Sequence, residues 1–163
     1  MDNHLFFAIM FKDKEILTNV INELKNNFGN IVSESPEYDF NFSSHYEDEF
    51  GSNLKKTIIV FDNKISKDNL ADIKIICSQI EKEFCSDDDK RAANIDPGYF
   101  NDKEVVLASF KGKRFKEDIG NNIFVHKVLE IENGNFKGFF HTFPDFKSKL
   151  VQDFFLTIIK QYL

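Results

Sequence analysis

The chain has 163 residues, of which 42% are hydrophobic and 29% charged, and a formal net charge of -6 at pH 7. This composition supports a buried core and excludes a largely disordered chain, and the length predicts a single domain over residues 1–163. The negative charge repels phosphate backbones, so we expect no nucleic acid partner. Two cysteines are too few for a secreted disulfide framework, and no apolar stretch reaches the length of a membrane span. We therefore expect a cytoplasmic protein with no membrane contact.

The first expected elements are a buried strand and a helix. Residues Leu5–Phe11 are apolar at both parities, which is typical of a central strand with both faces covered. Asp13 offers a helix cap, and apolar residues recur every three or four positions from Ile16 to Phe28. Gly29 is placed to end this helix.

A second strand and helix are expected after a more polar segment. Ile31–Phe40 has the polarity of an edge strand, and Ser43–Gly51 predicts one or two helical turns. Ile58–Phe61 is a second fully apolar strand, and Ser66 is a candidate cap for the helix that follows. The apolar stripe of that helix comprises Leu70, Ile73, Cys77, Ile80 and Phe84.

The remaining elements complete an α+β fold. The apolar run Val105–Phe110 supplies a sixth element, which predicts a ferredoxin-like βαββαβ core. Asn133-Gly134 favours a type I′ turn between strands Ile123–Ile131 and Phe136–Phe143, so a C-terminal antiparallel hairpin should extend this core. A final amphipathic helix should pack on the sheet through Val151, Phe154, Phe155, Ile158 and Tyr162.

The first candidate site is the acidic and aromatic segment from Asp39 to Gly51. Crowded carboxylates can have a raised pKa or hold a divalent cation, and on a helix His45 and Glu49 would lie one turn apart, at metal-ligand spacing. The alternative is a capped surface helix whose aromatic residues anchor it to the core. The candidate ligand-binding residues of this segment are Asp39, Tyr46, Glu47 and Glu49.

The second candidate is the segment Asn94-Ile95-Asp96-Pro97-Gly98-Tyr99. Proline fixes φ and glycine permits positive φ, so the segment predicts a defined turn. Such a turn either has only a structural role or lines a binding site. In the second case the candidate ligand-binding residues are Asn94, Asp96 and Tyr99.

The third candidate is Asp145, within the segment His141–Phe146. Its carboxylate is a candidate ligand contact, and its alternative role is to cap the last helix. The common phosphate-loop, dinucleotide-turn, nucleophile-elbow and zinc motifs do not occur in the sequence. The sequence therefore indicates no particular cofactor.

These three segments, in this order, resemble a bacterial and archaeal family catalogued as domain of unknown function 4416. The family pattern is Asp-Phe-x-x-x-Tyr-Tyr-Glu-x-Glu-Met-Gly, then Asn-Leu-Asp-Pro-Gly-Tyr before a strand, then Trp-Thr-Tyr-Pro-Asp-Tyr. The chain departs from it at His45, Phe50 and His141, so neither histidine is expected to be a required base. The resemblance implies a shared fold and site but no established activity. The matching residues are Asp39, Phe40, Tyr46, Glu47, Glu49, Gly51, Asn94, Asp96, Pro97, Gly98, Tyr99, Thr142, Pro144 and Asp145.

Two functional hypotheses follow from these segments. The first is a binding domain for a small polar or cationic ligand, or for a protein partner, in which the acidic segment meets the Asp-Pro-Gly-Tyr turn. Tyr46 and Tyr99 would then supply flat contact surface. The alternative is a metal-dependent hydrolase or phosphoryl-transfer enzyme that holds a hard divalent cation. Its ligands would be Asp39, Glu47, Glu49 and Asp96.

Overall fold

The computed structural model describes residues 2–40, 47–50, 53–86, 88–111, 116–139 and 142–162, with only the backbone described at residues 47 and 48. The strands are β1 (His4–Phe11), β2 (Ile31–Glu34), β3 (Tyr38–Asp39), β4 (Lys55–Lys64), β5 (Ala93–Phe100), β6 (Glu104–Ser109), β7 (Glu117–Asp118), β8 (Phe124–Glu132) and β9 (Asn135–Gly138). The helices are α1 (Lys14–Phe28), α2 (Glu47–Phe50), α3 (Asn69–Glu83) and α4 (Lys149–Tyr162), with a 3-10 turn, η1 (Pro144–Lys147).

The described residues form a mixed α/β fold built on one antiparallel sheet. The strand order is β2-β4-β1-β5-β6-β8-β7, while β3 also pairs with β4 and β9 also pairs with β8. A ferredoxin-like core is not confirmed, because the sheet has nine strands. Among the described helices, none has both the length and the apolar character required to cross a membrane.

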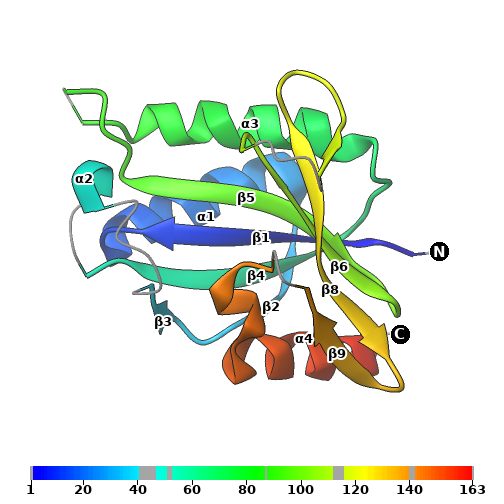
Figure 1. Ribbon diagram of the computed structural model, residues 1–163. Helices are drawn as coiled ribbons and strands as arrows, with labels where there is room; N and C mark the ends of the chain where they lie inside the picture. The colour runs from blue at the N-terminus through cyan, green and yellow to red at the C-terminus, as the bar shows by residue number, and fades with distance from the viewer. Residues whose placement is uncertain are drawn as a thin grey trace.

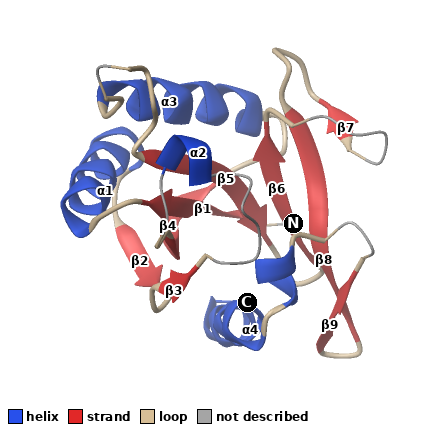
Figure 2. Ribbon diagram, turned by 60° about the vertical axis from the view of Figure 1, so that its left-hand side comes forward, coloured by secondary structure: helices blue, strands red, loops and turns tan. Residues whose placement is uncertain are grey.

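The sheet lies between two layers of helix. Helices α1 and α3 cover one face and α4 covers the other (Figure 1). Figure 2 shows the same layers from another side, with β8 and β9 beside α4. Successive residues of a strand point to opposite faces, so β1 contributes to both cores. Leu5, Phe7, Ile9 and Phe11 pack with α1 and α3, and Phe6 and Ala8 pack with α4.

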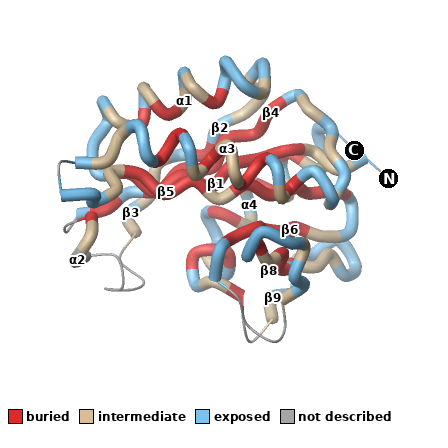
Figure 3. Tube along the Cα trace, turned by 90° about the horizontal axis from the view of Figure 1, so that it is seen from above, coloured by how far each residue is buried: buried red, intermediate tan, exposed pale blue. Residues whose placement is uncertain are grey.

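The prediction that Leu5–Phe11 forms a doubly covered central strand is confirmed, because all seven residues are buried. Figure 3 shows the burial along β1 and β5 at the centre of the molecule. The cap of α1 is also confirmed, since the Ile16 N–H donates to Asp13 Oδ1 at 3.0 Å. The expected cap at Ser66 is wrong. Helix α3 begins later, at Asn69, and the Asn69 side chain instead accepts the Ser66 N–H at 2.8 Å.

The predicted turn at Asn94–Tyr99 is wrong, because this segment lies inside β5 and pairs with β1 along its whole length. Strand β6 pairs with β5 only from Gly98 to Phe100, so the first part of β5 has an open edge. The Ile95 N–H faces this edge, where a side chain of α3 accepts it. Pro97, two residues further, faces the same edge, where no strand needs an N–H from it.

Gly98 is required by close packing and not by a turn. A Cβ at this position would lie 2.3 Å from the Val106 carbonyl oxygen and 2.5 Å from the Phe6 ring. The strand that follows α3 is therefore β5, and the predicted strand Val105–Phe110 corresponds to β6, one position farther out in the sheet.

The C-terminal region agrees with the sequence. Strands β8 and β9 form the expected hairpin, with positive φ angles of 53° at Asn133 and 78° at Gly134. The second strand is shorter than predicted, because β9 ends at Gly138 and Phe143 instead precedes η1. Helix α4 packs on the sheet through Val151, Phe155 and Ile158, as predicted, and Phe154 is partly buried beside them. Tyr162 was expected on the same stripe but is 41% exposed at the end of the helix.

Candidate functional site

A pocket opens where β5 and β6 separate. Its volume is about 260 Å³. Because β6 leaves β5 at Gly98, the first half of β5 borders the pocket without a neighbouring strand on that side. The lining combines three cations, one carboxylate, an amide, a hydroxyl and two aromatic rings. These residues are Lys74, Arg91, Asn94, Asp96, Ser109, Phe110, Lys111 and Phe143.

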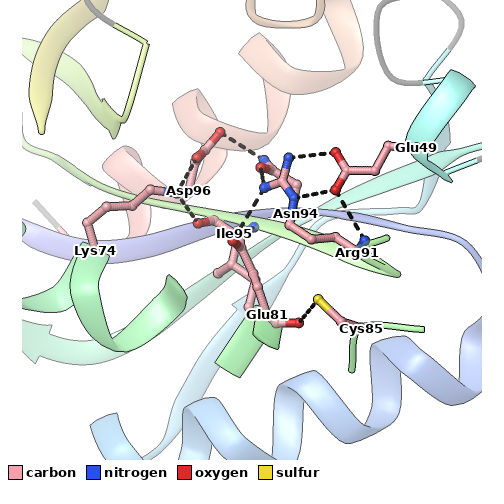
Figure 4. Close-up of polar contacts among 8 residues, drawn as sticks. All are labelled: Glu49, Lys74, Glu81, Cys85, Arg91, Asn94, Ile95 and Asp96. Carbon is pink, nitrogen blue, oxygen red and sulfur yellow. Dashed lines mark hydrogen bonds and ion pairs between the residues drawn. The ribbon is translucent and has the colours of Figure 1, made fainter. Parts of the chain in front are cut away.

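Lys74 reaches the pocket from α3, and its side chain is only 2% exposed. Its Nζ donates to the Ile95 carbonyl oxygen and to Asp96 Oδ1, both at 2.8 Å (Figure 4). Burial alone would lower the pKa of Lys74, but the carboxylates of Asp96 and Glu81 outweigh burial and raise it. Lys74 is therefore held as an ammonium ion.

Arg91 joins α2 to the start of β5. Its Nε and one terminal nitrogen donate to the two oxygens of Glu49 at 2.8 and 3.0 Å, and its backbone N–H donates to Glu49 as well. Its other terminal nitrogen donates to Asn94 Oδ1 at 2.9 Å and to Glu81 Oε1 at 3.3 Å. The hydrogen bond from Arg91 lowers the pKa of Glu49, so this carboxylate is ionised.

Asn94 and Asp96 complete the network. The Asn94 amide donates to Asp96 Oδ2 at 3.1 Å, which links Arg91 to the Lys74–Asp96 ion pair. Burial acts to raise the pKa of Asp96, but Lys74 acts more strongly in the other direction, so the pKa is lowered. A continuous series of hydrogen bonds thus runs from Glu49 to Lys74.

Three of the predicted site residues meet in this network: Glu49, Asn94 and Asp96. Tyr99 does not, because it is three residues from Asp96 in β5, so its side chain points to the other face of the sheet. The Tyr99 side chain is buried and donates to Glu104 Oε1 at 3.1 Å. Asp39 is exposed on β3 and is not part of the pocket lining.

Other parts of the acidic segment lie outside the described residues. Tyr46 and His45 are among them, and of Glu47 only the backbone in α2 is described. Across the described part of the chain there is no group of three or more His, Cys, Asp or Glu side chains that could hold a metal ion.

Asp145 does not cap α4, so that prediction is wrong. The residue before α4 is Ser148, whose Oγ accepts the Val151 N–H at 3.4 Å. Asp145 is instead buried in η1, where Oδ2 accepts hydrogen bonds from Lys56 Nζ at 2.8 Å and from the Tyr38 hydroxyl at 2.9 Å. It therefore ties η1 to β3 and β4.

The sequence predictions did not include Lys56, Lys74, Glu81 or Arg91. For Lys74 and Glu81, the apolar stripe of α3 indicates burial. Residues 70, 73, 77, 80 and 84 define one face of the helix, and positions 74 and 81 fall on that same face. A charged residue on an apolar stripe needs a buried partner, which Asp96 supplies to Lys74.

The chain belongs to the family described as domain of unknown function (DUF4416), whose model matches residues 1–162. The resemblance stated from the three sequence segments is therefore confirmed. Comparison with curated proteins and with solved structures gave no match. Since the family description assigns no activity, the function has to be argued from the pocket itself.

Proposed function

We propose that the chain binds a small organic anion in the pocket between β5 and β6. The observation that carries this proposal is the buried ammonium of Lys74 in the lining. An ammonium has three N–H donors, and the described hydrogen bonds of Lys74 use two of them, to Ile95 and Asp96. Its raised pKa keeps it a donor and not a nucleophilic amine.

The rest of the lining fits an anion with an organic part. Lys111 and Arg91 add two more cations to the lining, and Arg91 is bonded to Glu49 and Glu81. The ring of Phe110 lies 5.1 Å from Lys74 Nζ and is 43% exposed, so an apolar surface stands beside the charge. A volume of about 260 Å³ is close to the lower end of the range for ligand pockets, which favours a small metabolite.

The same contacts argue against the cationic ligand and the metal-dependent enzyme suggested by the sequence. The carboxylate of Glu49 is bonded to Arg91, and that of Asp96 is bonded to Lys74. A divalent cation would have to displace both partners. The protein-partner hypothesis has no comparable support from the described contacts.

We also propose that β1, α1, β2, β4, α3 and β5 form a ferredoxin-like unit within a single domain. The support for this proposal is the order β2-β4-β1-β5 with antiparallel neighbours throughout, and the position of α1 and α3 on one face. The other strands would then be additions at the β5 side of the unit.

The binding proposal is tested by NMR titration with ethyl phosphate and propionate. We expect saturable shifts of the Ser109 and Lys111 amides with at least one of these anions. Lys111→Met should weaken binding by about threefold or more, while Lys103→Met, an exposed cation outside the lining, should not change it. If neither anion gives saturable shifts, or if the two variants bind alike, the proposal is wrong.

A further inference from the structure

The pocket between β5 and β6 has two aromatic side chains in its lining, Phe110 and Phe143. Among the phenylalanines that the structure describes, Phe110 is the only exposed one, at 43%. Single exposed apolar residues are common on protein surfaces. A ring that lines a pocket, however, is a contact surface for whatever fills the pocket. The two rings therefore bear on the chemistry of the ligand.

The two rings come from separate parts of the chain. Phe110 directly follows β6, and its ring lies beside Lys74, which comes from α3. Phe143 directly precedes η1, and its ring packs edge-on against His126 with 5.2 Å between the ring centroids. His126 pairs with Leu107, which belongs to the core beneath α4, so Phe143 lies over that face of the sheet. The pocket thus has two aromatic walls of independent origin.

Each ring has an ammonium group beside it. Lys74 Nζ lies 5.1 Å from the ring centroid of Phe110, and Lys116 Nζ lies 5.2 Å from that of Phe143. Lys116 Nζ also donates to Ser109 Oγ at 3.4 Å, which keeps it at the lining. An ammonium draws the electrons of a ring toward itself, so the rest of the ring favours electron-rich groups. A ring that bears an anionic group suits both the charges and the aromatic surfaces.

The size of the pocket fits one such ring. An apolar cavity of roughly 150 Å³ holds benzene, and this pocket has a volume of about 260 Å³. An anionic group that accepts the remaining N–H of Lys74 would lie close to Phe110, because that nitrogen is beside the Phe110 ring. A ring attached directly to the anionic group would then reach Phe110. Pairs of aromatic rings gain free energy beyond the area that they bury, which an aliphatic group of equal size does not.

We propose that the ligand of the pocket is an aromatic anion, a single flat ring that bears a carboxylate or a phosphate. Its anionic group binds at Lys74, and its ring packs against Phe110, with Phe143 as the second aromatic wall. This inference rests on the proposed function, since it specifies the organic part of the same ligand. It restricts the ligand class to small aryl carboxylates and aryl phosphates.

Two matched pairs of probes test the inference. Benzoate and cyclohexanecarboxylate have the same charge and ring size, but only benzoate is flat and aromatic, and phenyl phosphate and cyclohexyl phosphate differ in the same way. The amides of Ser109 and Lys111 report binding in an NMR titration. We expect wild-type protein to bind the aromatic member of at least one pair about threefold more tightly or better, as ring pairing predicts.

Three variants show whether this preference comes from Phe110. Phe110→Leu keeps an apolar side chain without a ring and should lose the preference while still binding the cyclohexyl anions. Phe110→Tyr keeps the ring and should keep the preference. Phe154→Leu, at a half-buried phenylalanine of α4 outside the lining, is the matched control and should keep it too. Because Phe110 is exposed, neither change there removes a core contact.

The outcomes separate this inference from the anion site on which it rests. If wild-type protein binds ethyl phosphate or propionate but shows no preference within either ring pair, or binds none of the ring probes, the inference is wrong and the anion site stands. A preference that persists in Phe110→Leu, or that disappears in Phe110→Tyr or Phe154→Leu, would overturn it as well. Failure of the ring probes together with ethyl phosphate and propionate would instead refute the anion site itself.

Discussion

Lys74 and Glu81, seven residues apart on α3, bind the two polar groups of a single residue, Ile95. Lys74 Nζ donates to the Ile95 carbonyl oxygen at 2.8 Å, and the Ile95 N–H donates to Glu81 Oε2 at 2.7 Å. Two helical turns of α3 thus supply the hydrogen bonds that a neighbouring strand would otherwise make. The pocket and the backbone of β5 therefore depend on the same lysine.

Lys74→Met should destabilise the protein by about 3–5 kcal/mol, because it leaves Asp96 buried without its cation and the Ile95 carbonyl without a donor. The measurement is the free energy of unfolding in urea. Lys82→Met, an exposed position on the same helix, is the matched control and should change stability by no more than about 0.5 kcal/mol. Equal effects of the two substitutions would show that the ion pair does not stabilise the fold.

Gly98→Ala should cost about 3 kcal/mol or more, since its Cβ would overlap the Val106 carbonyl oxygen and the Phe6 ring. Gly138→Ala in β9 is the control, because a Cβ there meets its nearest atoms at 3.7 Å, an ordinary contact distance. Thermal or urea unfolding of the two variants compares them directly. A stable Gly98→Ala protein would mean that β5 and β6 separate more easily than the packing indicates.

Glu49 should contribute stability that is lost in acid. Arg91 donates hydrogen bonds that hold the pKa of Glu49 below its ordinary value of 4.5, so folding favours the ionised form. The contribution is present above pH 4.5 and falls as the pH drops through the folded-state pKa. The stability difference between wild type and Glu49→Gln should therefore shrink between roughly pH 5 and pH 3. Glu132→Gln, an exposed residue, should show no comparable trend in the same urea series.

Tyr38 should contribute stability that is lost in alkali. Burial, and then the nearby charge of Asp145, raise the pKa of Tyr38 well above its ordinary value of 10.0. A raised pKa gives stability that is complete below pH 10 and is lost as the pH rises further. The unfolding free energy should fall less steeply above pH 10 in Tyr38→Phe than in wild type. Phenolate absorbance checks the cause, because the unfolded chain should ionise its tyrosines at lower pH than the native protein.

Most of the fold follows from local patterns in the sequence. The doubly apolar run at Leu5–Phe11, the cap at Asp13 and the turn at Asn133-Gly134 all depend on neighbouring residues, and all three predictions are confirmed. Strand β5 could not be found in this way. Proline and glycine normally indicate a turn. Here Pro97 is tolerated because β5 has an open edge, and Gly98 is required because Val106 packs closely against it. Both conditions are set by distant parts of the chain.

Only part of the candidate site can be predicted from the sequence. The gathering of carboxylates and amides in two segments predicts Glu49, Asn94 and Asp96 as site residues, and these three share one network. The residue that joins them, Arg91, belongs to neither segment, so the segments do not predict it. Tyr99 would share the site only if its segment formed a turn. In a strand, alternation sends it to the other face.

The open side of β5 also bears on how separate molecules meet. An unpaired stretch of backbone in a sheet is a template on which a strand from another copy can add, and such pairing leads to aggregates. In this chain Pro97 offers no N–H, and the groups of Ile95 are occupied by Lys74 and Glu81. Lys74 and Glu81 thus leave the backbone groups of Ile95 unavailable to a strand of another copy, and their removal would expose these groups to such pairing.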